Sequence, residues 1–286
     1  MPNVDQFESV FRSAVHDTFS HQRIEFSTVL FVTDLTGDEA RTFADRTRQF
    51  LKTLSHGDKP EWMIVSGDEF SSTEDLLQLV EERKPDLTVT CRNLHSSAWR
   101  YPHSLGSQLD VLLQLAPTPV LVLPHPNRNE AGDTSSNPLD TVMAMTSHLA
   151  NDPRLVNHAA RFVAPGGKLL LAHIEDEPAF EKIVDAIARI PTIDTDEARE
   201  KISRQLLKQP DDYIESCRTI LADAGADLTV EGIVEFGHHL SSYRKLIDER
   251  KIDLLVMNTK DEDQLAMHGL AYPLAVELRD IPLLML

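Results

Sequence analysis

Short apolar runs without polar alternation recur along the chain, and stretches with helical spacing of apolar residues lie between them. Two of these runs follow a proline, "VLVL" after Pro119 and "LLML" after Pro282. An apolar run without alternation is typical of a parallel strand buried on both faces. Because such runs alternate with helical stretches, the pattern predicts an α/β fold with a doubly wound parallel sheet.

A ten-residue motif occurs twice in the chain. "ERKPDLTVTC" begins at Glu82 and "ERKIDLLVMN" begins at Glu249. Before each copy lies a helix-like stretch with serines suited to its N-cap. After each copy come a polar loop, a short helical stretch, a proline and an apolar strand. The chain therefore reads as two related halves.

The two halves predict two domains joined by a linker. Residues 126–137 are rich in Asn, Gly, Ser and Pro, which is typical of a linker. Residues 138–286 contain five expected strands and form the second domain. Residues 1–125 form the first domain, shortened by one strand–helix unit. Its N-terminal segment has apolar residues at a helical period, and we expect this helix to cover the surface that the missing helix leaves open.

Charge and composition exclude several classes of protein. The formal net charge is −18, which disfavours an approach to a phosphate backbone, so no nucleic-acid partner is expected. No apolar run approaches the roughly 20 residues of a membrane helix, so no membrane insertion is expected either. The N-terminus does not resemble a signal peptide, and Cys91 and Cys217 are expected to be reduced thiols in a cytoplasmic protein.

The strand "VLFVTDLT", the "DLTVTCR" strand, the segment "LGSQLDVLLQLAPTPVLVLP" and the "LLLAHIED" strand together resemble the universal stress protein family in its tandem form. The resemblance covers roughly residues 24–125 and 138–286. It implies two doubly wound parallel-sheet domains that are packed as a pseudo-dimer. In the family, domains pair through the edge formed by the final strand. We therefore expect the two proline-led strands to bring the halves together.

The resemblance also implies candidate ligand residues. Family members that bind ATP have an Asp after the first strand and a Gly-x2-Gly-x9-Gly-Ser/Thr loop after the fourth. Asp34 and Thr36 match the first motif, and Gly106 and Ser107 match the end of the loop. The first two loop glycines are absent. No cofactor is therefore expected in general, although ATP or AMP in the first half stays possible.

The second half departs further from the ATP-binding pattern. Thr146 or Ser147 replaces the Asp, and Leu270 follows the matching Gly269. The acidic residues Asp261 to Asp263 would lie where the phosphates bind, and nearby carboxylates repel a triphosphate. No nucleotide is expected in this half.

The chemistry expected of the chain is binding without catalysis. It contains no Gly-x-Ser-x-Gly elbow and no Walker loop, and no metal-ligand set is visible around its histidines. The resemblance thus implies a non-catalytic stress-response or regulatory role, with a protein partner or self-association. One alternative is a sensor that binds ATP or AMP through the first domain only. A weaker alternative is a small-molecule hydrolase or transferase on the same fold.

Overall fold

The computed structural model describes residues 18–55, 59–97, 104–126, 138–145, 152–259 and 271–286. The elements of the first half are β1 (Thr28–Val32), α2 (Gly37–Phe50), the 3-10 helix η1 (Lys52–Ser55), β2 (Glu61–Val65), α3 (Thr73–Arg83), β3 (Leu87–Cys91), α4 (Ser107–Leu115) and β4 (Val120–Leu123). Those of the second half are β5 (Thr141–Met145), α5 (Pro153–Phe162), β6 (Gly167–Asp176), α6 (Glu177–Ile187), α7 (Thr195–Asp223), β7 (Leu228–Gly237), α8 (His239–Arg250), β8 (Leu254–Met257), α9 (Ala271–Glu277) and β9 (Leu283–Met285).

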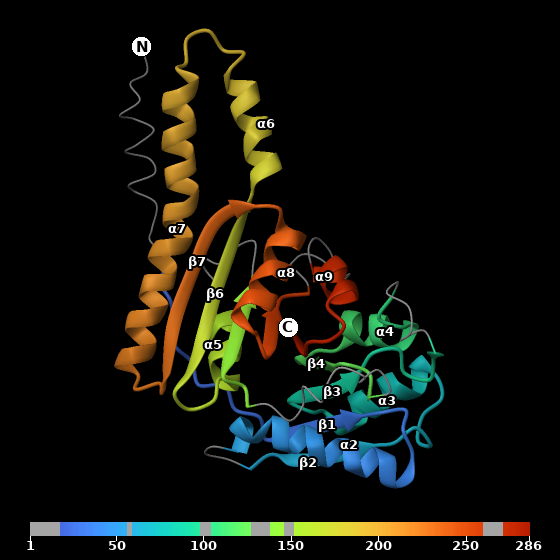
Figure 1. Ribbon diagram of the computed structural model, residues 1–286. Coiled ribbons are helices and arrows are strands. Elements are labelled where there is room, and N and C mark those ends of the chain that lie inside the picture. Colours follow the sequence, from blue (N-terminus) through green and yellow to red (C-terminus); the bar gives the residue numbers. More distant parts are fainter. Residues whose placement is uncertain (1–17, 56–58, 98–103, 127–137, 146–151, 260–270) are drawn as a thin grey trace.

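The strands form one sheet in the order β2-β1-β3-β4-β9-β8-β5-β6-β7. Every neighbouring pair is parallel except β4 and β9, which pair antiparallel with Leu121 opposite Leu284. The expected α/β fold with parallel sheets is confirmed, and the two final strands do join the halves. In Figure 1 β4, at the edge of the first half, lies near the C-terminus of the chain.

The junction is fully buried. Leu121, Val122, Leu283 and Leu284 each have an exposed fraction of 0%. Because β9 pairs with β8 on one side and β4 on the other, its backbone groups face a strand on both sides. An exposed edge is therefore avoided at the end of each half.

The repeated ten-residue motif has the same structural role in both halves. In each copy the lysine adopts a left-handed backbone, with φ of 45° at Lys84 and 52° at Lys251, and closes the preceding helix. The side chain of the aspartate two positions later then accepts a hydrogen bond from a backbone amide of the neighbouring strand. Asp86 Oδ2 accepts from the amide of Thr28 at 2.9 Å, and Asp253 Oδ2 accepts from that of Thr141 at 2.8 Å. Each copy thus ends a helix and aligns the start of a strand with its neighbour.

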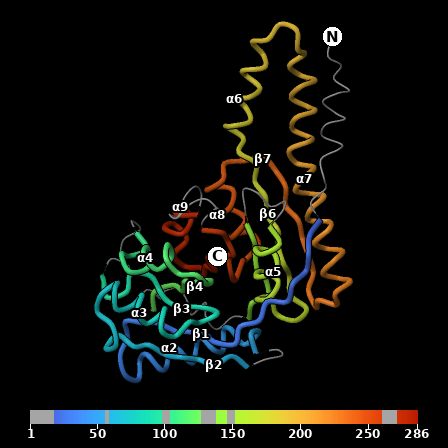
Figure 2. The backbone as a smooth tube through the Cα atoms, turned by 180° about the vertical axis from the view of Figure 1, so that it is seen from behind, coloured from blue at the N-terminus to red at the C-terminus, as the bar shows by residue number. Residues whose placement is uncertain are grey.

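The segment before β1 packs on the second half. The Phe19 amide donates to Ser216 Oγ of α7 at 3.1 Å, and its ring meets Tyr213 edge-on. Arg161 of α5 donates to the carbonyls of Ile24, Thr53 and Leu54 at 2.8–3.0 Å. Figure 2 shows this stretch running past α5 toward β1. It links the halves at a second place, away from β4 and β9.

The second half also carries a helical hairpin. α6 and the N-terminal part of α7 rise above the end of the sheet in Figure 1. α7 continues through Pro210, and β6 and β7 pair over Gly167–Asp176 and Leu228–Gly237. The predicted N-terminal helix and the linker at 126–137 fall almost wholly outside the described residues. The domain limits and the place of that helix stay predictions.

Candidate functional site at the edge of the first half

The carboxyl ends of β1, β3 and β4 meet at one edge of the sheet, where open α/β folds bind ligands. Asp34 follows β1, Cys91 ends β3 and His125 follows β4. One ligand-type atom from each of these three side chains lies within 4.8 Å of the other two. The structure therefore brings together residues from three neighbouring strands.

Asp34 is engaged by the protein itself. Its Oδ2 accepts a hydrogen bond from the His95 amide at 3.0 Å, and His125 Nε2 lies 3.9 Å from the same oxygen. Burial raises the pKa of Asp34, but the nearby His125 side chain and the His95 amide outweigh this effect, and the pKa lies below its ordinary value. The carboxylate is thus held ionised and occupied on one oxygen.

The loop after β3 folds over Asp34 because two of its residues take left-handed backbones. Asn93 has φ of 55° and His95 has φ of 54°. The His95 ring packs edge-on against Phe70, with 4.7 Å between the ring centroids. This turn aims the His95 amide at Asp34.

Gly106 is required by packing. Its φ is +97°, and a Cβ there would lie 2.8 Å from the Cα of Asn93. The Asn93 amide also donates to the Leu105 carbonyl at 2.8 Å. The glycine therefore lets the start of α4 approach the loop after β3, which explains its presence without a ligand.

The other two predicted residues are exposed. Thr36 is the N-cap of α2 but makes no side-chain cap hydrogen bond, and Ser107 is the first residue of α4. The loop after β3 links the two predicted pairs, since His95 contacts Asp34 and Asn93 packs on Gly106. No observation shows that Asp34, Thr36, Gly106 and Ser107 hold a ligand, so this assignment stays a prediction.

Sequence reasoning missed Cys91, His95 and His125 as parts of this edge. The sequence predicts Cys91 only as a reduced thiol, and in the structure it is fully buried. Burial raises the pKa of its thiol well above the ordinary value, and the charge of Asp34 raises it further. The available signal for His125 was its place just after an apolar strand, which puts it at the carboxyl edge.

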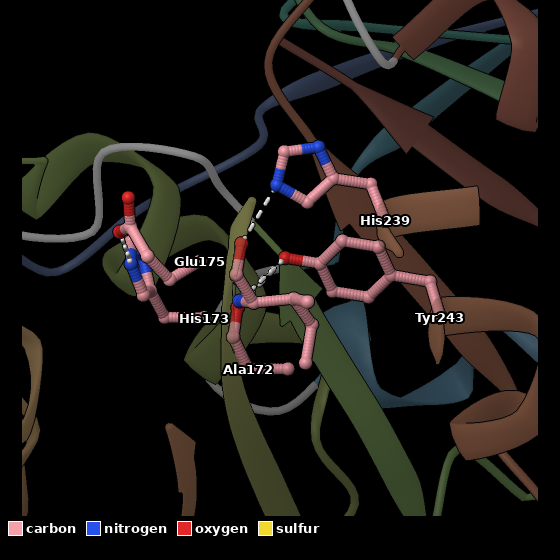
Figure 3. Close-up of polar contacts among 6 residues, drawn as sticks. Ala172, His173, Glu175, His239 and Tyr243 are labelled. Carbon is pink, nitrogen blue, oxygen red and sulfur yellow. Dashed lines mark hydrogen bonds and ion pairs between the residues drawn. The ribbon is translucent and has the colours of Figure 1, made fainter. Parts of the chain in front are cut away.

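At the matching edge of the second half, side chains of α8 form hydrogen bonds with the backbone of β6. β6 runs beyond Ala172, which is the last residue that pairs with β5. The Tyr243 hydroxyl accepts from the Ile174 amide at 3.3 Å, and His239 Nε2 lies 2.8 Å from the Ile174 carbonyl. Figure 3 shows both α8 side chains reaching this strand. They satisfy backbone groups that β5 does not reach.

Two further polar residues at this edge have partners within the protein. His173 Nε2 lies 3.1 Å from Glu175 Oε2, on the side away from Tyr243 in Figure 3. Asn258, just after β8, donates to Asp152 at the start of α5. The acidic segment Asp261 to Asp263 and the residues Thr146, Ser147, Gly269 and Leu270 lie outside the described residues.

Comparison with known proteins supports the fold. No protein-family model and no curated protein matches the chain. A universal stress protein from Archaeoglobus fulgidus is similar, with a TM-score of 0.51 and 12% identity over 91% of this chain and 96% of that one. A putative universal stress protein from Pseudomonas aeruginosa has a TM-score of 0.47 and 16% identity, over 100% of this chain and 88% of that one. The chain therefore has the universal stress protein fold, as its motifs indicated.

Proposed function

We propose that the protein is a non-catalytic binding protein of the universal stress type, with a stress-response or regulatory role in the cytoplasm. The observation that carries this proposal is the engagement of Asp34 by the His95 amide and by His125. Asp34 Oδ2, which is bound internally, is not available to a nucleoside without rearrangement of the loop after β3, and Oδ1 is buried. The protein then acts through a protein partner or self-association.

In the part of the chain that the structure describes, none of the helices has both the length and the apolar character of a membrane span. The surface is acidic overall, with a formal net charge of −18. This charge favours solubility and disfavours anionic partners such as nucleic acids.

A nucleotide sensor is the second candidate, and one observation favours it. The N-cap of α4 is Gly106, which has no side chain to satisfy the first amides of the helix. Helix N-termini with free amides attract phosphate groups. A nucleotide that opened the loop after β3 could place a phosphate there.

Thermal unfolding with ATP or AMP, each with and without Mg²⁺, separates the two candidates. We expect no stabilisation by either nucleotide. A ligand at 100 times its dissociation constant would add about 2.7 kcal/mol, which is a shift of several degrees. A nucleotide-dependent rise in the midpoint would contradict the proposal.

If such a rise occurs, two variants locate the site. Asp34→Ala removes the carboxylate at the sheet edge, and Asp38→Ala removes an exposed carboxylate from the first turn of α2. Loss of the shift in the first variant alone would establish the first-domain nucleotide sensor. Loss in neither variant would place the nucleotide away from Asp34.

A further inference from the structure

We propose that Asp34, Cys91 and His125 form a binding site for a zinc-class divalent cation. The three ligand atoms lie within 4.8 Å of one another among the described residues. They come from three adjacent strands, β1, β3 and β4, whose order in the sheet fixes their spacing. The site does not depend on the proposed function, since it would exist with or without a nucleotide.

The donor set selects the kind of metal. A thiolate sulfur, an imidazole nitrogen and a carboxylate oxygen are the ligands that Zn²⁺ accepts, whereas Mg²⁺ and Ca²⁺ prefer oxygen alone. When the ion binds, the Cys91 thiol gives its proton to solvent and the thiolate coordinates. The negative charges of Cys91 and Asp34 then balance the two positive charges of the ion. The buried edge becomes electrically neutral.

The distances require only a small contraction. In tetrahedral zinc sites the bonds measure about 2.0–2.3 Å, so the ligand atoms lie about 3.3–3.8 Å apart. Here His125 Nε2 lies 3.9 Å from Asp34 Oδ2, which is too long for a direct hydrogen bond. The imidazole and the carboxylate, whose other oxygen is the unpartnered Oδ1, are therefore already close to this spacing. Since the three ligand atoms already lie within 4.8 Å of one another, side-chain rotations that shorten these distances by about 1 Å or less would give tetrahedral zinc geometry.

Asp34 carries a second, independent sign of a ligand. Its Oδ1 is buried and has no hydrogen-bond partner in the described part of the chain. A buried polar atom without a partner calls for an explanation, and an ion supplies one. The His95 amide on Oδ2 orients the carboxylate, as hydrogen bonds to ligating carboxylates do in metal sites.

The site is nearest to solvent at Asp34. The side chain of Asp34 is 14% exposed, and that of His125 is 2% exposed. Cys91 is fully buried. In zinc sites with three protein ligands, water completes the coordination, and the partly exposed Asp34 is the side on which water would bind.

Titration of the metal-free full chain with Co²⁺ tests the site, because Co²⁺ replaces Zn²⁺ and reports thiolate ligation by a charge-transfer absorption. We expect this absorption to saturate at about one equivalent of Co²⁺ per chain, as for a single site, and to disappear when Zn²⁺ is added. The chain has only two cysteines, so any thiolate signal comes from Cys91 or Cys217.

Two cysteine variants form a matched pair. Cys217 lies on α7 and is buried, as Cys91 is. Cys91→Ala should lose the absorption, and Cys217→Ala should keep it. No thiolate signal in the unchanged protein, a signal that survives in Cys91→Ala, or its loss in a folded Cys217→Ala would each overturn the site.

Asp34→Asn covers the case in which Cys91→Ala fails to fold. It keeps the size of the side chain and removes the charge. Circular dichroism establishes folding before the titration. We expect the Zn²⁺ affinity, measured by competition with a chromophoric chelator, to fall about 10-fold or more. An unchanged affinity would overturn the assignment of Asp34.

Discussion

Deletion of Leu283–Leu286 is expected to prevent the chain from folding into a soluble protein. The four side chains are 0–8% exposed, and burial of each contributes about 1.5–3 kcal/mol. Their sum of roughly 6–12 kcal/mol is comparable to the whole stability of a typical domain. The deletion also leaves β4 and β8 with bare edges that invite aggregation. Expression followed by size-exclusion chromatography measures the outcome.

A point substitution tests the same junction while the chain can still fold. Leu284 pairs with Leu121 of β4 and Val256 of β8 and is fully buried. Leu284→Ala should lower the free energy of unfolding by about 2–5 kcal/mol. Leu115→Ala is the control, since Leu115 is 62% exposed and should change it by no more than about 0.5 kcal/mol. Equal losses, or a soluble deletion variant with its halves still docked, would refute the junction.

Substitution of Arg92 by Met is expected to lower the free energy of unfolding by about 2–5 kcal/mol. Arg92 is 3% exposed, and its guanidinium donates to the carbonyls of Ala275 and Leu278 at the end of α9. The residue belongs to the first half and the helix to the second. Without the arginine, two buried carbonyls lose their donors, and a positive charge is lost from a helix C-terminus. Urea denaturation measures the change.

Arg244→Met is the matched control. Arg244 of α8 pairs with Glu277 of α9 at 3.0 Å, but both side chains are about half exposed, at 56% and 44%. An exposed ion pair contributes at most about 1 kcal/mol. A loss in Arg92→Met no larger than in Arg244→Met would show that the buried contact to α9 does not stabilise the two halves together.

The sequence predicted the parts of the fold that follow from local patterns. The apolar runs predicted the strands, and the repeated motif predicted the two halves. The motif recurs because Asp86 and Asp253 each accept a hydrogen bond from the first amide of the neighbouring strand. The pairing of the final strands followed from the resemblance and is present. The rising hairpin of α6 and α7 was not predicted as such, since its helical period does not show how far it leaves the sheet.

The candidate site was predicted only in part. Asp34 could be found from the end of its strand, but its partners could not. His95 reaches it only because Asn93 and His95 take left-handed backbones, which no motif in this loop signals. Likewise Arg92 reads as a loop residue, and only the fold brings α9 beside it. Contacts of this kind depend on tertiary packing and lie beyond a single sequence.

The central claim is that the His95 amide and His125 hold Oδ2 of Asp34, and that for this reason no nucleotide binds at this edge. The backbone amide of His95 reports on that contact directly, because it is the donor to Asp34 Oδ2. Its NMR signal can be followed during titration of the full chain with Mg-ATP. The account predicts that the signal stays in place up to millimolar nucleotide. A saturable movement of the His95 signal together with those of Gly106 and Ser107 would contradict it.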